Sequence, residues 1–157
     1  MNKQHVYHLT VEWTGNTGNG TQNYQAYERS HTVKIPNKVD IYCSSDPAFR
    51  GDKTKHNPEE LLVAAIANCH MLWYLHLCAV AGVVVTSYID RPMGVMQESQ
   101  NGPDRFTQVT LNPEVEVKEP TMVAKAMALH GKVGEHCCIA NSCNFPVYHK
   151  PTCTVGA

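Results

Sequence analysis

The first part of the chain alternates between hydrophobic and polar side chains, a pattern typical of β-strands. Residues 5–13 alternate in this way, residues 14–20 are rich in Gly and Asn, and a second strand-like run covers residues 24–35. We therefore expect a hairpin or meander that extends to about Cys43. The polar, irregular residues 44–56 predict a surface loop.

A strong helix-start signal follows this loop. Asn57 is suited to the N-cap, Pro58 to the first helical position, and Glu60 stands three residues after the cap, which completes a capping box. The apolar residues that follow predict a helix over residues 58–81, ended by Gly82.

This predicted helix is apolar enough to raise the question of a membrane span. Its middle contains Asn68, His70 and His76, and no cluster of Lys or Arg flanks either end, as membrane spans usually have. A helix that is apolar on all sides is otherwise one buried at the centre of a fold. We therefore predict a central core helix and no membrane insertion.

The second half of the chain mixes strand and helix patterns. The expected elements are a strand at residues 83–89, a turn at 101–103, a strand at 105–118, a helix at 121–136, a short helix at 137–144 and a strand at 145–155. Strands and helices are segregated along the chain, which indicates an α+β fold.

Length and composition favour one soluble domain over residues 1–157, with 43% hydrophobic residues to build its core. Thirteen basic and fourteen acidic residues give a net charge of -1 without any block of like charge. This balance argues against nucleic acid as a partner. The N-terminal residues lack the apolar stretch of a signal peptide, so the expected location is the cytoplasm.

The cysteine content directs attention to redox or metal chemistry. The seven cysteines are Cys43, Cys69, Cys78, Cys137, Cys138, Cys143 and Cys153. This is many for a cytoplasmic protein, and an odd number fits poorly with a framework of structural disulfides. Free cysteine also serves as a small buried hydrophobe, and we assign that role to Cys43, Cys78 and Cys153.

A zinc site is one alternative use of the C-terminal cysteines. Its ligands would be His136, Cys137, Cys138 and Cys143, completed by His149 or Cys153. Adjacent cysteines do not easily bind one ion together, and no C-x-x-C motif is present, so we do not favour it. His70 and His76 lie six residues apart and thus on different helix faces, which predicts core histidines rather than a metal site.

Two motifs, in a defined order, suggest a family. The first is Asn57-Pro58-Glu59 at the helix start, with Cys69 ten residues after that Glu in an alanine-rich stretch; the second is His136-Cys137-Cys138-Ile139-Ala140. Together they resemble the OsmC/Ohr family. The resemblance implies two curved antiparallel sheets wrapped around two central helices in an intertwined homodimer. It also implies a thiol peroxidase that reduces organic hydroperoxides without a cofactor.

The resemblance also implies residue roles: Cys69 matches the peroxidatic cysteine, Cys137 the resolving cysteine and Glu59 the active-site glutamate. A thiolate that attacks a peroxide becomes a sulfenic acid, and a nearby thiol then condenses with it to a disulfide. Cys138 stands where many relatives have proline or phenylalanine, so it remains open which of the adjacent cysteines resolves.

The reactivity of Cys69 requires a lowered pKa. Cys69 lies about three turns into its helix, and the helix dipole acts only within the first turn. The resemblance implies an arginine from the preceding loop, for which Arg50 is the nearest candidate. An ungapped alignment places the family arginine on Phe49, however, so Arg29 remains a substitute.

Glu59 and Cys69 cannot meet through their own helix, because ten helical residues span about 15 Å. They would meet if two copies of the helix crossed antiparallel near Ala64 and Ala65, where small side chains permit close approach. The spacing therefore predicts an obligate homodimer with active sites at the interface. Glu59 would then orient the arginine and the peroxide by charge-assisted hydrogen bonds.

The substrate and reductant follow from the same reasoning. Met71, Leu72, Trp73 and Tyr74 are expected to wall the site with apolar surface, which favours an alkyl or lipid hydroperoxide. Reduction of the disulfide needs an external dithiol, and the resemblance points to lipoyl groups or a lipoylated protein. The rival interpretation is a non-enzymatic thiol- or lipid-binding protein on the same fold.

Overall fold

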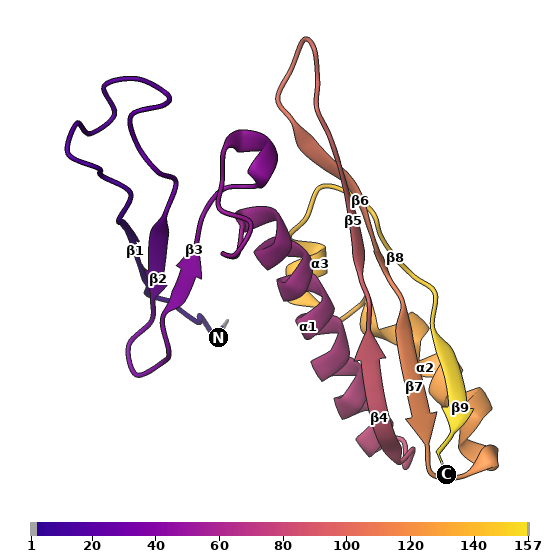
Figure 1. Cartoon of the computed structure of the whole chain (residues 1–157). Helices are drawn as coiled ribbons and strands as arrows, with labels where there is room; N and C mark the ends of the chain where they lie inside the picture. Colours follow the sequence, from indigo (N-terminus) through magenta and orange to yellow (C-terminus); the bar gives the residue numbers. More distant parts are fainter. Residues whose placement is uncertain (1–2, 157) are drawn as a thin grey trace. The chain divides into compact units, whose positions relative to one another are not determined.

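The computed structural model describes residues 3–156 of the chain. Its internal contacts divide the chain into two compact units, Met1–Leu61 and Leu62–Ala157. Figure 1 shows the elements of both units along the sequence, and each unit is described by itself.

The first unit contains a three-stranded antiparallel meander. Its strands are β1 (Thr10–Trp13), β2 (His31–Lys34) and β3 (Ile41–Cys43), paired in chain order. The predicted meander is confirmed, but two strands are shorter than expected. The segment before β2 forms a loop, because Arg29 donates hydrogen bonds to the carbonyls of Tyr24 and Tyr27 at 2.7 and 2.6 Å. These bonds curl the backbone instead of leaving it extended.

The loop after β3 contains a short 3-10 helix, η1 (Pro47–Phe49). Asp46 caps it by accepting a hydrogen bond from the Ala48 N–H at 2.7 Å. Arg50 follows in the left-handed conformation, with φ of 64°. At Gly51 a Cβ atom would lie 1.5 Å from the Ser45 carbonyl oxygen, so only glycine permits this tight turn.

The helix α1 (Pro58–Val80) begins and ends where the sequence predicts. The Asn57 side chain accepts from the Glu60 N–H at 2.8 Å, and the Glu60 carboxylate accepts from the Asn57 N–H at 3.2 Å. These reciprocal bonds are the predicted capping box. Gly82 follows the helix with φ of 73°, a conformation that favours glycine.

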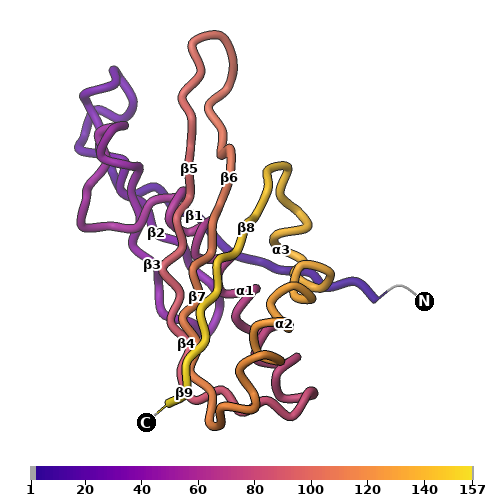
Figure 2. The backbone as a smooth tube through the Cα atoms, turned by 90° about the vertical axis from the view of Figure 1, so that its right-hand side faces the viewer, coloured from indigo at the N-terminus to yellow at the C-terminus, as the bar shows by residue number. Residues whose placement is uncertain are grey.

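The second unit has two three-stranded sheets. Its strands are β4 (Val85–Asp90), β5 (Met93–Gln97), β6 (Arg105–Leu111), β7 (Pro113–Val117), β8 (Val147–His149) and β9 (Thr152–Val155). One sheet has the strand order β4-β7-β9 and the other has the order β5-β6-β8. The chain passes directly from one sheet to the other three times, between β4 and β5, between β6 and β7, and between β8 and β9. Figure 2 shows the result: β5, β6 and β8 continue the lines of β4, β7 and β9.

The junction between these sheets corrects two sequence-based predictions. Residues 105–118 were expected to form one strand, but Asn112 interrupts it, and Pro151 interrupts the strand expected at 145–155. Asn112 is held at the junction, where its N–H donates to Asp90 and its side-chain amide donates to the Arg91 carbonyl, at 2.8 and 2.9 Å. Strand β5 was not predicted, since Gly94 weakens its strand pattern.

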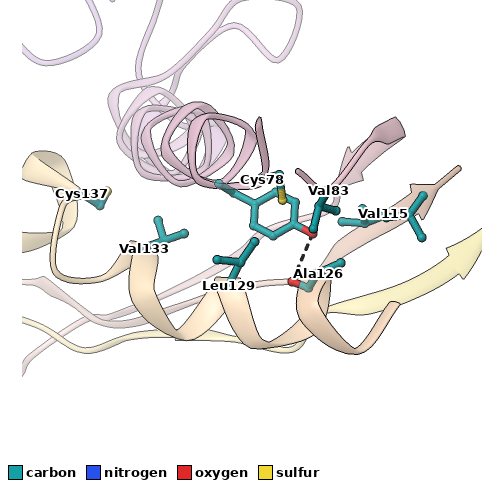
Figure 3. Packing of buried hydrophobic residues seen from close by; sticks show 9 residues of the cluster. Cys78, Val83, Val115, Ala126, Leu129, Val133 and Cys137 are labelled. Carbon is teal, nitrogen blue, oxygen red and sulfur yellow. Dashed lines mark hydrogen bonds between the residues drawn. The ribbon is translucent and has the colours of Figure 1, made fainter. Parts of the chain in front are cut away.

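Three further helical segments complete the second unit: η2 (Pro120–Met122), α2 (Val123–Val133) and α3 (Cys138–Asn141). The alternating burial of β7 turns Val115 and Val117 toward a core shared with α1 and α2. Figure 3 shows this packing, with Leu129 and Val133 of α2 facing the helix α1. The α+β class and the two central helices are therefore confirmed.

By length and composition, α1 is the one helix among residues 3–156 that is long and apolar enough to cross a membrane. It buries Ile66, Tyr74 and Cys78 in the two hydrophobic clusters of the second unit. The helix therefore acts as the core helix of a globular fold, as its interrupting histidines predict.

Candidate functional site

Two of the predicted site cysteines meet in the second unit. Cys69 lies on α1, is partly buried, and packs against the cluster that contains Cys137. Cys137 is the N-cap residue of α3 and only 2% exposed. Cys69 thus packs against the same apolar cluster that buries Cys137, although 68 positions separate the two cysteines in the sequence. A sulfenic acid on Cys69 would therefore form beside a second thiol.

The surroundings of Cys69 act on its pKa in both directions. Burial is the largest effect and raises the pKa of the thiol, and the contact with Cys137 raises it further. The backbone N–H of Ile139 and the thiol of Cys138 act against this by hydrogen bonding, which lowers the pKa. The net direction is upward, so a thiolate on Cys69 requires an additional positive charge.

The segment that carries Cys137 is held against α1 by an aromatic stack. The rings of Trp73 and His136 lie 4.9 Å apart at an angle of 24°. Trp73 is one helical turn beyond Cys69, and His136 directly precedes Cys137, so this stack holds the start of α3 against the part of α1 that carries Cys69. Cys138, the next residue, is exposed.

The remaining cysteines have the roles expected from the sequence. Cys43 and Cys78 are 0% and 1% exposed, and Cys153 packs against the core of the second unit. Cys143 is partly buried and donates a weak hydrogen bond to the Ile139 carbonyl at 3.4 Å. All seven cysteines are free thiols.

The two candidate arginines lie in the first unit and differ in their bonding. Both line a cavity of about 480 Å³. The guanidinium of Arg29 lies 4.2 Å from the ring centroids of both Tyr24 and Tyr27 and donates to their carbonyls. Arg50 has only a looser approach to the Tyr24 ring, at 5.9 Å. Arg29 is thus occupied in holding its loop, whereas Arg50 is the less committed cation.

Glu59 lies in the first turn of α1, as predicted, and is partly buried. Its Oε2 atom is buried without a hydrogen-bond partner among the described residues. A buried carboxylate oxygen without a partner is costly, so it is a strong acceptor for an incoming cation or donor. Along the continuous helix, Glu59 and Cys69 are about 15 Å apart.

A small apolar cavity lies on α1, one to two helical turns beyond Cys69 along the helix. It has a volume of about 240 Å³ and is lined by Leu72, Trp73 and His76. Leu72 is 62% exposed, so it offers apolar surface to this cavity. Tyr74 was expected to join this wall, but that prediction was wrong: its side chain is fully buried on another face of the helix.

A buried group of histidines was largely missed by the sequence reasoning. His70 and His130 are 5% and 1% exposed, and the ring of His149 lies 5.6 Å from that of His70. His70 is a core histidine, as expected, but His76 is exposed, so that prediction was wrong. The partner His130 had no signal in the sequence, because it lies 60 residues from His70.

The zinc alternative finds no support in the geometry. Within residues 3–156, no group of three or more His, Cys, Asp or Glu side chains is arranged to hold a metal ion. His136 is instead stacked on Trp73, and Cys143 bonds to a backbone carbonyl.

The sequence matches a known protein family. The OsmC-like protein family model matches residues 51–150, which is more than half of the chain and includes both cysteine motifs. The chain belongs to the OsmC-like family. No curated protein matches the sequence.

Solved structures of OsmC-like proteins share this fold. An OsmC-like protein of unknown function from Vibrio cholerae is 28% identical, with a TM-score of 0.85 over 95% of this chain and 100% of its own. An organic hydroperoxide resistance protein from Legionella pneumophila has 15% identity and a TM-score of 0.70, covering 98% of this chain and 100% of its own. The organic hydroperoxide resistance protein OhrB of Bacillus subtilis has 17% identity and a TM-score of 0.67, covering 94% and 98%. At the lower identities the likeness establishes the OsmC fold alone.

Proposed function

We propose that this OsmC-like protein is a thiol peroxidase that reduces organic hydroperoxides through Cys69 and a resolving thiol. The packing of Cys69 against the apolar cluster that contains Cys137 is the observation that carries this proposal. The family also includes structures named as organic hydroperoxide resistance proteins, which supports the same chemistry. The proposed location is the cytoplasm, where seven free thiols would stay reduced.

In the first step, the Cys69 thiolate attacks the terminal oxygen of R–O–OH. The O–O bond breaks, Cys69 becomes a sulfenic acid, and the alkoxide leaves with a proton as the alcohol R–OH. The Cys137 thiol then attacks the sulfenic sulfur, which forms the Cys69–Cys137 disulfide and releases water. An external dithiol, such as a lipoyl group, supplies the two electrons that restore both thiols.

The pKa of Cys69 sets the main requirement of this mechanism. Burial raises that pKa, so the proposal assigns Arg50 as the cation that stabilises the thiolate. Glu59, with its unpartnered carboxylate oxygen, is assigned to orient that guanidinium and the peroxide. These roles follow the family resemblance and give the carboxylate a partner.

The apolar cavity on α1 supports an organic substrate. Leu72 and Trp73, which line this cavity together with His76, offer a hydrophobic surface about one helical turn beyond Cys69. An alkyl chain buried there would gain about 0.8 kcal/mol for each CH₂ group removed from water. Hydrogen peroxide has no such group, so alkyl hydroperoxides are the expected class.

The raised pKa of Cys69 also favours a second candidate, a non-enzymatic protein that binds lipid or thiol ligands in the apolar cavity. Peroxide consumption with dihydrolipoamide separates the two. The peroxidase consumes cumene hydroperoxide faster than hydrogen peroxide and loses this activity in Cys69→Ser. Equal, slow consumption by the wild type and Cys69→Ser rejects the peroxidase and favours the binding protein.

A further inference from the structure

Two adjacent cysteines of opposite accessibility follow the helix α2. Cys137 is 2% exposed and belongs to the apolar cluster against which Cys69 packs, whereas the next residue, Cys138, is exposed to solvent. Both thiols also influence the pKa of Cys69 by hydrogen bonding. We propose that Cys138 is a relay thiol, which takes over the disulfide from Cys137 and presents it to the external reductant. This inference rests on the proposed peroxidase function and adds a third cysteine to it.

The local structure keeps Cys138 within reach of Cys69. Cys137 is the N-cap of α3 and Cys138 is its first residue, so the two thiols leave the backbone at adjacent points. Stacking of Trp73 on His136 fixes the entry to α3, and the Asn141 side chain ties α3 to the Gly134 carbonyl at 3.0 Å. The start of the segment is therefore held against α1, and its end is tied to the C-terminus of α2.

Access to the disulfide is the problem that a relay solves. A dithiol must bring its sulfur into line with the disulfide bond, and the rate depends on which sulfur it reaches. Cys137 lies in an apolar cluster with Leu129 and Val133 and is only 2% exposed, so an incoming reductant has little access to its sulfur. Figure 3 shows these residues. A bridge to Cys138 instead places one sulfur atom at the surface.

The relay is an ordinary thiol–disulfide exchange. The Cys138 sulfur attacks Cys69, the Cys69–Cys137 bond breaks, and a Cys69–Cys138 bond forms. The proton of the Cys138 thiol ends on Cys137, so the exchange involves no net oxidation. Because the reacting groups are held side by side, the step is intramolecular and has a high effective concentration.

Reduction then proceeds at the exposed sulfur. One thiol of the external dithiol attacks Cys138, and Cys69 leaves as a thiolate that accepts a hydrogen bond from the Ile139 N–H. The second thiol of the reductant completes its own disulfide and releases Cys138 as a thiol.

The first test measures reduction of protein that has been oxidised with one equivalent of cumene hydroperoxide. Dihydrolipoamide is added, and recovery of free thiols is followed by alkylation and mass spectrometry. Cys138→Ser should slow this recovery at least ~10-fold, because the reductant must then reach a buried bridge. Cys143→Ser is the matched control: it removes a thiol from the same segment and should stay within about twofold of the wild type.

The second test asks whether Cys69 and Cys138 form a bond. After oxidation, Cys137→Ser should contain an intramolecular Cys69–Cys138 disulfide and no dimedone adduct, whereas the Cys137→Ser/Cys138→Ser double variant should be labelled by dimedone at Cys69. A Cys138→Ala variant repeats the first test without the serine hydroxyl.

The outcomes separate this inference from the proposed function. A wild type that turns over peroxide, together with Cys138 variants that are reduced at the wild-type rate, overturns the relay and leaves the peroxidase. Dimedone labelling of Cys137→Ser equal to that of the double variant also overturns it. A wild type that does not consume peroxide overturns both.

Discussion

His70 of α1 and His130 of α2 form a buried hydrogen bond, with 3.1 Å between Nε2 of the first ring and Nδ1 of the second. The rings are stacked, and the Tyr74 ring lies 3.8 Å from His130 on the other side. The pair links the two central helices of the second unit. Since one imidazole must donate and the other accept, the bond requires at least one neutral ring.

Acid should weaken the fold through this pair. Burial lowers the pKa of His70 from 6.5 to about 4 and that of His130 to about 3, with His149 as a nearby like charge. Below pH 6.5 these histidines bind protons in the unfolded chain but stay neutral in the folded chain. Their contribution to the free energy of unfolding is therefore fully present above this pH and is lost as the pH falls toward 4. The expected slope is at most about 1.4 kcal/mol per pH unit for each histidine.

Urea unfolding between pH 7.5 and pH 4 measures this effect. His130→Gln should flatten the dependence of unfolding free energy on pH, since glutamine does not titrate. His76→Gln removes an exposed histidine from α1 and should keep the wild-type slope. If the three proteins have the same slope, the buried pair is not its source.

The hydroxyl of Tyr74 provides a second link between these helices. It donates to the Ala126 carbonyl at 3.3 Å, shown as the dashed line in Figure 3. Tyr74→Phe should lower the unfolding free energy by about 1 kcal/mol, the usual net value of such a bond. Tyr148→Phe, at a residue 51% exposed, is the control that should change stability little in thermal melts. Equal stability of all three proteins would show that the hydroxyl bond contributes nothing.

The capping box at the start of α1 should be worth a measurable amount. Asn57→Ala removes the acceptor for the Glu60 N–H, and the expected loss is about 1 kcal/mol of unfolding free energy. Asn68→Ala changes the same residue type at an exposed interior position of the helix and should be neutral or slightly stabilising. Chemical denaturation of the two variants compares them directly, and an equal effect at both positions would contradict a specific cap.

Local sequence signals predicted the features that local physics determines. The capping box and Gly82 set the limits of α1, and the cysteine motifs singled out Cys69 and Cys137, which the fold places at the same apolar cluster. The interruption at Asn112 was not predictable in this way, because it depends on bonds to Asp90 and to Arg91 about twenty residues away. Strand patterns on either side of Asn112 look continuous when read alone.

In the candidate site, too, the decisive features depend on tertiary packing and not on local sequence. Exposure of Cys138 and burial of Cys137 decide which thiol a reductant reaches, yet the two residues are adjacent and chemically identical in the sequence. Only the placement of α3 against α1 distinguishes them. The pairing of His70 with His130 likewise depends on how two helices pack, which no pattern within either helix encodes.

The different bonding of the two arginines predicts opposite effects of mutation. Arg29→Ala should lower the melting temperature, because two carbonyl bonds and two aromatic contacts hold the Tyr24–Tyr27 loop. Arg50→Asn should instead lower the rate of peroxide reduction at least ~10-fold, through loss of the proposed cation. Asparagine is chosen because it tolerates the left-handed conformation of Arg50.

Melting curves and single-turnover oxidation of both variants test this assignment. Thiolate titration by ultraviolet absorbance adds a direct readout, since loss of the activating cation should raise the pKa of Cys69. If Arg29→Ala raises that pKa and Arg50→Asn does not, the roles are reversed and Arg29 is the activating residue.

The spacing of Glu59 and Cys69 predicts a homodimer that is built around α1. Helix α1 carries apolar residues that the chain itself leaves exposed, such as Leu72 and Val80 at 62% and 75%. An antiparallel crossing of two copies near Ala64 would cover apolar surface and bring the unpartnered carboxylate of Glu59 toward the partner's active site.

Ala64→Arg places a bulky charge at this crossing and should convert the dimer to monomer in light scattering, with loss of peroxidase activity. Lys125→Ala, on the exposed side of α2, should leave both the mass and the activity unchanged. Because each proposed site needs Glu59 from the other chain, mixing Glu59→Gln with Cys69→Ser protein should restore activity to part of the population. Heterodimers then contain one site with both native residues, whereas sites built within one chain would gain nothing from mixing.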